Sequence, residues 1–148
     1  MDEAAFHARR KALDHAPCAF EKALLAGCAA CELAQRHALA ERELVACTAS
    51  VARADCETFL ALLRERATFA LRLPLPHVPA PHAVAMKLQC GGIAGLQQAL
   101  AGADDGVHRL LAAATARWGG LLDLPWPELV RSVVAWRGRR RHRDAGSP

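Results

Sequence analysis

The segment from Cys28 to Cys56 most constrains the fold of this chain, because it carries four of the six cysteines. Cys28 and Cys31 form a C-x2-C pair, and Cys47 and Cys56 follow after gaps of fifteen and eight residues. An unbroken helix from Cys31 to Cys47 would separate their sulfurs by roughly 24 Å at the usual helical rise. A site shared by these cysteines therefore requires the chain to turn between them.

Length and composition favour a single helical domain. The chain has 148 residues, of which 53% are hydrophobic and only 5% aromatic. A chain of this length buries most of its apolar surface in one core, and abundant alanine and leucine favour closely packed helices. We therefore expect an all-α fold, a single compact domain of five or six short helices over residues 1–136, with little or no sheet.

Apolar residues that recur every three or four positions predict the helices. The clearest pattern runs from Val51 to Leu71, with Cys56 on its inward face. Four prolines between Leu73 and Ala85 predict a long loop over residues 73–85, because proline excludes helix there. The remaining helices are expected at Asp2–Leu13, Cys18–Ala26, Ala29–Glu43, Ile93–Leu100, 104–118 and 125–136.

The net charge of +4 comes entirely from the end of the chain. Residues 1–136 carry 14 basic and 14 acidic side chains, whereas residues 137–148 carry five arginines and one aspartate. This composition gives no basic surface on the domain itself. We expect residues 137–148 to be a disordered tail, and any nucleic-acid or acidic partner to bind only through residues 137–143.

The sequence indicates a cytoplasmic protein. It contains neither an apolar run long enough to span a membrane nor an N-terminal secretory signal. Cysteines in a reducing compartment are free, metal-bound or redox-active more often than they form permanent disulfides. We therefore expect no membrane partner, and we consider a protein redox partner or a client complex instead.

An iron–sulfur cluster is the leading hypothesis for the cysteines, since thiolates are its usual ligands and an apolar helical shell suits it. The candidate ligands are Cys28, Cys31, Cys47, Cys56 and Cys90. Their C-x2-C…C…C order resembles the ligand order of high-potential iron–sulfur proteins over the first four of these residues alone, and we carry over no function from it. Zinc, a redox disulfide within the C-x2-C pair, and buried thiols without a metal are the alternatives.

Cys90 is the candidate ligand outside the Cys28–Cys56 segment. Gly91 and Gly92 follow it, which predicts a sharp backbone turn before a helix whose amide dipoles would stabilise a thiolate. Cys31, Cys47, Cys56 and Cys90 are the favoured core of the ligand set, Cys28 competes for a place, and Cys18 is expected to be a buried filler. His37, His77, His82 and His108 cannot be placed near these sulfurs from sequence.

These features favour an iron–sulfur or other thiolate-metal protein that serves electron transfer, redox sensing or assembly of a larger complex. Because no catalytic constellation accompanies the cysteines, we expect an accessory protein rather than an enzyme. The alternative is a metal-free helical interaction module with buried cysteines and a basic tail.

Overall fold

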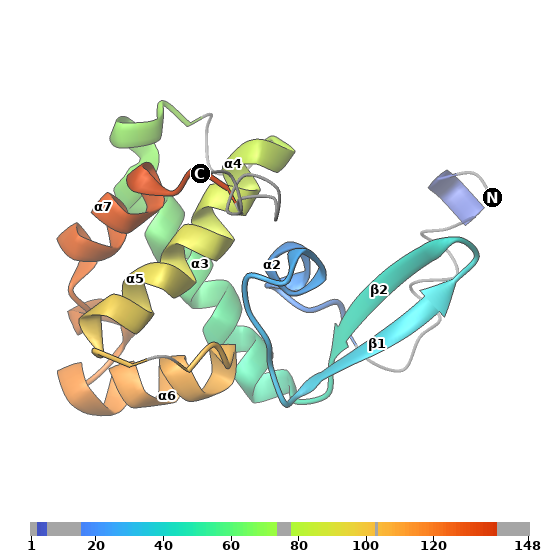
Figure 1. Cartoon of the computed structure of the whole chain (residues 1–148), viewed down its shortest axis with the longest axis horizontal. Coiled ribbons are helices and arrows are strands. Elements are labelled where there is room, and N and C mark those ends of the chain that lie inside the picture. Colours follow the sequence, from blue (N-terminus) through green and yellow to red (C-terminus); the bar gives the residue numbers. More distant parts are fainter. Residues whose placement is uncertain (1–2, 6–15, 74–77, 103, 139–148) are drawn as a thin grey trace, which may run out of the picture.

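The structure is a computed structural model that describes residues 3–5, 16–73, 78–102 and 104–138. It is mostly helical, with one small antiparallel sheet, and the sheet projects from the helices (Figure 1). We call residues 50–135 the helical body and residues 16–49 the N-terminal layer. The elements are α2 (Glu21–Ala26), β1 (Ala34–Leu39), β2 (Arg42–Cys47), α3 (Ser50–Leu71), α4 (His82–Met86), the π-helical turn η1 (Lys87–Gly91), α5 (Gly92–Ala99), α6 (Val107–Trp118), the 3-10 turn η2 (Leu121–Asp123) and α7 (Trp126–Ala135).

The core of the molecule lies where α3 meets the later helices. Phe59 in α3 is fully buried, and its ring centroid lies 6.2 Å from that of Phe20 and 5.6 Å from that of Trp126. Phe20 comes from the N-terminal layer and Trp126 from α7, so this aromatic row joins three parts of the chain. Aromatic contacts of this kind contribute both apolar burial and ring–ring attraction.

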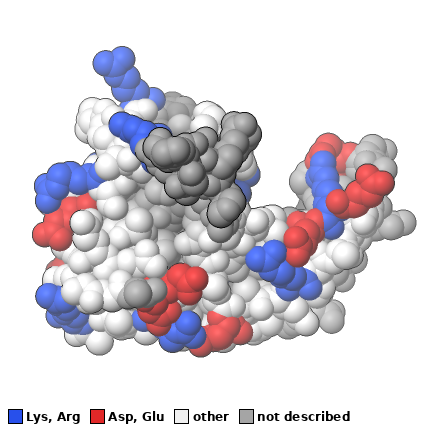
Figure 2. Space-filling view, viewed as in Figure 1, with Lys and Arg blue, Asp and Glu red and all other residues white. Residues whose placement is uncertain are grey.

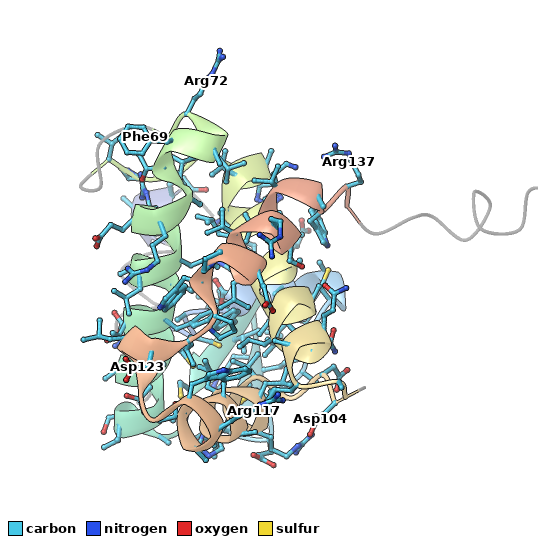
Figure 3. The ribbon with its side chains drawn as sticks, turned by 90° about the vertical axis from the view of Figure 1, so that its left-hand side faces the viewer. Phe69, Arg72, Asp104, Arg117, Asp123 and Arg137 are labelled. Atoms are coloured by element: carbon cyan, nitrogen blue, oxygen red, sulfur yellow. The ribbon has the colours of Figure 1, made fainter. Side chains whose placement is uncertain are left out.

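Five of the expected helices are confirmed, namely α2, α3, α5, α6 and α7. The apolar periods of the three longest, α3, α6 and α7, place Leu63, Leu110 and Leu129 in the core. Gly119 ends α6 with a φ of 96°, a conformation that glycine adopts without strain. Long, strongly periodic segments therefore folded as their pattern predicts. The two ends of the helical body are marked by Phe69 and Arg72 at one side and Asp104 and Arg117 at the other (Figure 3).

The helix predicted over Ala29–Glu43 is wrong, because this segment forms a β-hairpin. β1 and β2 pair from Ala34 with Cys47 to Leu39 with Arg42, and Ala40 turns the chain at a φ of 57°. Residues with high helix propensity occupy β1, but β2 carries the core residue Val45. The backbone hydrogen bonds of Val45 favour the strand over a helix. Its carbonyl accepts from the Cys18 N–H at 2.9 Å, and its N–H donates to the Glu21 carboxylate at 2.7 Å. Tertiary pairing here overrides helix propensity.

The turn predicted at Cys90-Gly91-Gly92 is also wrong. Residues 82–99 form one helical run whose middle turn, η1, is a π-helix, so Cys90 lies inside a helix rather than at its start. The glycines serve close packing instead of a turn, since a Cβ on Gly91 would lie 2.7 Å from Val133 Cα in α7. The same run shortens the loop expected over 73–85, because α4 begins at His82.

Some expectations concern residues outside the described ranges. These are most of the helix at Asp2–Leu13, His77, and the tail beyond Gly138. In the part of the chain that is described, we find no helix long and apolar enough to cross a membrane. Acidic and basic side chains alternate along the hairpin (Figure 2), where Arg36 and Glu43 form an ion pair at 3.1 Å.

Candidate metal centre

Four cysteines from four separate segments line one small cavity. They are Cys18 before α2, Cys31 before β1, Cys47 at the end of β2, and Cys56 in the second turn of α3. The cavity has a volume of about 20 Å³ and lies between the N-terminal layer and the helical body. The hairpin is what brings Cys31 and Cys47 together, because Ala34 pairs with Cys47. The turn that a shared site requires between these two cysteines is therefore present.

Backbone hydrogen bonds hold the cavity-lining thiols in place. Cys47 donates its N–H to Ala16 O at 2.8 Å, which fixes the end of β2 against the segment that carries Cys18. Cys31 is placed by its neighbour Ala30, whose N–H donates to Asp105 O at 2.9 Å and whose carbonyl accepts from Val107 at 2.8 Å. This pairing attaches the loop before β1 to the start of α6.

The thiols of Cys18 and Cys56 resist ionisation where they lie. Burial raises the pKa of Cys18 to about 11 and that of Cys56 to about 12, and for Cys56 the neighbouring Cys18, Cys31 and Cys47 add to the increase. Each thiolate thus disfavours ionisation of the neighbouring thiols, as expected of like charges in a poorly hydrated environment. A bound cation would reverse this repulsion, because it stabilises several thiolates at once.

Two of the sulfurs make hydrogen bonds with the backbone. The Phe20 N–H donates to Cys18 Sγ at 3.4 Å and lowers the pKa of that thiol, although burial outweighs it. Cys47 Sγ donates to Ala49 O at 3.3 Å. Backbone donors to sulfur are one means by which proteins stabilise metal-bound thiolates and tune iron–sulfur potentials.

The remaining wall is mainly apolar, with two basic side chains. Arg53 donates from Nε to Pro17 O at 2.8 Å, which holds α3 against the N-terminal layer. His108 lines this cavity and also a neighbouring one of about 310 Å³, which shares Ala52 and Cys56 with it. The apolar residues are Ala19, Leu33, Ala34, Ala52 and Val107.

Cys18 and His108 are the lining residues that sequence reasoning did not select. No spacing rule links Cys18 to the later cysteines, and the pairing of residues 16–18 with β2, which includes the bridge between Pro17 and Ala46, brings it beside Cys47. Among the described residues, no three Cys, His, Asp or Glu side chains already meet as a single-ion site. The four thiols therefore surround the cavity without converging on one point.

Cys28 and Cys90, two of the five expected ligands, are not among the described residues that line this cavity. They lie near each other instead, since burial first and the neighbouring Cys28 thiol second raise the pKa of Cys90. The C-x2-C pair is thus divided, because Cys31 faces the cavity while Cys28 turns to η1. All six cysteines are in the free thiol form.

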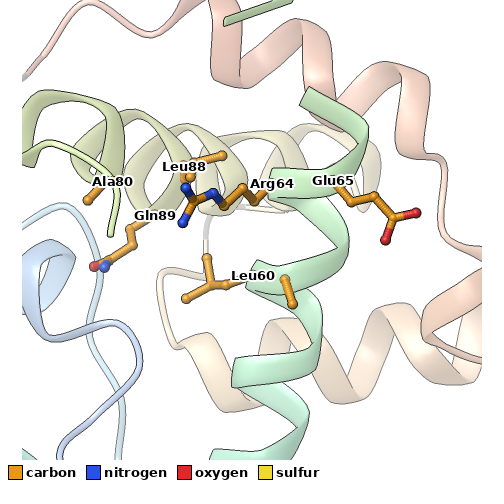
Figure 4. A pocket seen from close by; sticks show the side chains of 8 residues that line it. Leu60, Arg64, Glu65, Ala80, Leu88 and Gln89 are labelled. Carbon is orange, nitrogen blue, oxygen red and sulfur yellow. The ribbon is translucent and has the colours of Figure 1, made fainter. Parts of the chain in front are cut away.

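A larger cavity of about 520 Å³ lies between α3 and the α4–η1 run (Figure 4). Arg64 reaches into it and donates from Nη2 to Val78 O at 2.5 Å, while Glu65 points away. Its described lining contains neither cysteine nor histidine, so the thiol chemistry of this chain is located elsewhere. The lining residues are Leu60, Ala61, Arg64, Glu65, Ala80, Ala85, Leu88 and Gln89.

Comparison with known proteins gives no match: no protein family, no curated protein and no solved structure is significantly similar to this chain.

Proposed function

We propose that this chain is a metal-binding protein whose centre is formed by the thiolates of Cys18, Cys31, Cys47 and Cys56. The observation that carries the proposal is that these four side chains, from four separate segments, line one cavity. Four thiolates form a closed ligand shell of the kind that zinc and iron–sulfur clusters take. Burial first and repulsion by the neighbouring thiolates second raise the pKa of Cys56, and with a bound metal this repulsion would be replaced by attraction to the cation.

An iron–sulfur cluster is the occupant that we propose first. A cluster takes one thiolate at each of several positions, so its ligands need not converge on one atom. The arrangement of four thiols around a space, with mainly apolar walls and a backbone donor to Cys18 Sγ, suits such a ligand set. The chain would then act in electron transfer, in redox sensing or as an assembly factor.

Zinc is the second candidate, and the size of the cavity favours it. A space of about 20 Å³ holds one water-sized body, so an iron–sulfur core would require the thiol side chains to rotate outward. A zinc ion would instead draw the four sulfurs inward to Zn–S distances of about 2.3 Å. Its role would be structural, joining the N-terminal layer to the helical body.

Metal analysis of the full-length chain, purified without oxygen, separates these occupants. Iron and inorganic sulfide in fixed ratio to protein, with visible absorbance, support the cluster. Stoichiometric zinc in a colourless protein supports the second candidate. A colourless, stable chain that binds neither metal, even after reconstitution, would contradict both and favour the metal-free interaction module.

Single cysteine-to-serine variants test the ligand set. Replacing Cys18, Cys31, Cys47 or Cys56 should sharply lower the metal content per chain, because a hydroxyl is a poor substitute for a thiolate. Cys28→Ser and Cys90→Ser are the matched controls, and they should retain the metal. If Cys90→Ser loses it while Cys18→Ser does not, the ligand set expected from the sequence is the correct one.

A further inference from the structure

Cys28 and Cys90 form a second group of sulfurs, apart from the four cavity-lining thiols. Cys28 follows Gly27, which ends α2 in the left-handed conformation with a φ of 79°. The Cys28 N–H donates to Ala23 O at 2.9 Å, so the backbone holds this cysteine against the end of α2. α2 packs against η1, where the Ala23 N–H donates to Gln89 Oε1 at 3.0 Å. Cys28 lies just after α2 and Cys90 just after Gln89, and the Cys28 thiol is close enough to affect the pKa of Cys90.

Cys28 and Cys90 differ in solvent exposure. Cys90 is only 2% exposed, whereas Cys28 is half-buried. Burial, followed by the neighbouring Cys28 thiol, raises the pKa of Cys90 well above its ordinary value. Since the thiolate is the nucleophile in disulfide exchange, the more exposed Cys28 is suited to attack an external partner and the buried Cys90 to act second.

The backbone at Cys90 is unusual and well fixed. Cys90 lies in the π-helical turn η1, and such turns inside helices occur frequently at functional sites. The next residue, Gly91, lets α7 approach so closely that a Cβ would meet Val133 Cα at 2.7 Å. The helical body thus holds Cys90 rigidly, while Cys28 belongs to the N-terminal layer.

We propose that Cys28 and Cys90 are a redox-active dithiol that reduces a disulfide presented by a partner protein or a small thiol compound. The Cys28 thiolate attacks one sulfur of that disulfide, whose S–S bond breaks, and the first partner thiolate leaves. The Cys90 thiol then gives up its proton and attacks the Cys28 sulfur, which expels the second partner thiolate. The chain loses two protons and two electrons and gains the Cys28–Cys90 disulfide, while the partner disulfide becomes two thiols.

This dithiol is independent of the proposed metal centre, because neither cysteine belongs to its ligand set. The experiment incubates the reduced full-length chain with glutathione disulfide, traps the remaining thiols by alkylation in denaturant and maps the peptides. We expect one disulfide, joining Cys28 to Cys90, and four of the six thiols to remain alkylatable. A disulfide that joins any other two cysteines, or no disulfide under conditions that oxidise a small dithiol, would overturn the proposal.

Two variants test the order of attack. In Cys90→Ser the exchange should stop at the mixed disulfide, seen as one glutathionyl group on Cys28. Cys28→Ser should form neither the mixed nor the internal disulfide, because Cys90 is shielded from the oxidant. Cys90→Ala is a second variant should serine not fold at this buried position. A glutathionyl group on Cys90 in Cys28→Ser, or none on Cys28 in a folded Cys90 variant, would contradict the assigned roles. Unchanged metal content in Cys28→Ser keeps this result separate from the fate of the metal centre.

Discussion

The helical body and the N-terminal layer differ in how their structure is maintained. Of the nine largest fully buried side chains, seven belong to the body and only Phe20 and Val45 belong to the layer. Apolar burial is the dominant favourable term in folding, so the body can be stable largely by itself. The layer depends on strand pairing, on a few backbone bonds to the body and, in our proposal, on a metal between the two. The cysteines lie where the less stable N-terminal layer contacts the more stable helical body.

The strongest test of this comparison is Phe59→Ala, which removes the ring at the centre of the body. We expect a loss of roughly 3–5 kcal/mol in the free energy of unfolding, because a buried phenylalanine leaves a cavity that the surrounding helices cannot close. Urea unfolding followed by circular dichroism measures it. Phe69→Ala is the matched control: Phe69 is on the same helix but 95% exposed, so its removal should cost less than about 0.5 kcal/mol.

Removal of the metal should affect the N-terminal layer alone. At a metal concentration of 100 times the dissociation constant, binding contributes about 2.7 kcal/mol to the state that holds the ligands. Hydrogen exchange should therefore speed up in residues 16–49 after chelation, while the amides of α3 and α7 keep their protection. Equal loss of protection in both regions would show that the metal stabilises the whole domain rather than one junction.

A third test addresses the packing of η1 against α7. Gly91→Ala should cost roughly 1–3 kcal/mol, since the added methyl group meets backbone and helices must move apart. Gly102→Ala is the control, because its Cβ would meet nothing closer than 4.0 Å. Urea midpoints compare the two. If Gly91→Ala leaves the urea midpoint unchanged, α5 and α7 separate without cost and Cys90 is held less firmly than proposed.

The sequence predicts the body better than the layer for the same physical reason. α3, α6 and α7 have long apolar periods, so the pattern that buries their side chains also indicates their structure. The hairpin shows only a short apolar run, Leu44 to Ala46, within a segment of strong helix formers. Its structure depends on bonds to Cys18, Glu21 and Ala16, which are distant in the sequence.

The candidate metal centre, too, could be predicted from the sequence only in part. Cys31, Cys47 and Cys56 could be selected from spacing, and the need for a turn between the first two could be stated before the structure was known. Cys18 could not be selected, because its approach to Cys47 depends on the pairing of Pro17 with Ala46. Cys90 could not be placed either, since its glycines indicated a turn where close helix packing was the actual reason.

The smallest expected effect concerns the polar contacts between the two regions. Arg109 in α6 bonds to Asp104 at 2.8 Å and to Glu32 of the N-terminal layer at 2.5 Å. Two hydrogen bonds lower the pKa of the Asp104 carboxyl below its ordinary value. The one from the Arg109 side chain has the larger effect, and the one from the Gly106 N–H the smaller. A carboxyl with a lowered pKa in the folded state adds stability above its unfolded pKa, and this is lost as the pH falls through the folded value.

Asp104→Asn should therefore reduce stability slightly at neutral pH, and the difference from the unmodified chain should disappear in acid. The effect is small because these side chains are exposed to water, and added salt should reduce it further. Urea midpoints across the acid range, with Asp105→Asn as the neighbouring control, measure it. A deficit that stays constant with pH and salt would show that the charge pair of Asp104 with Arg109 has no part in joining the layer to the body.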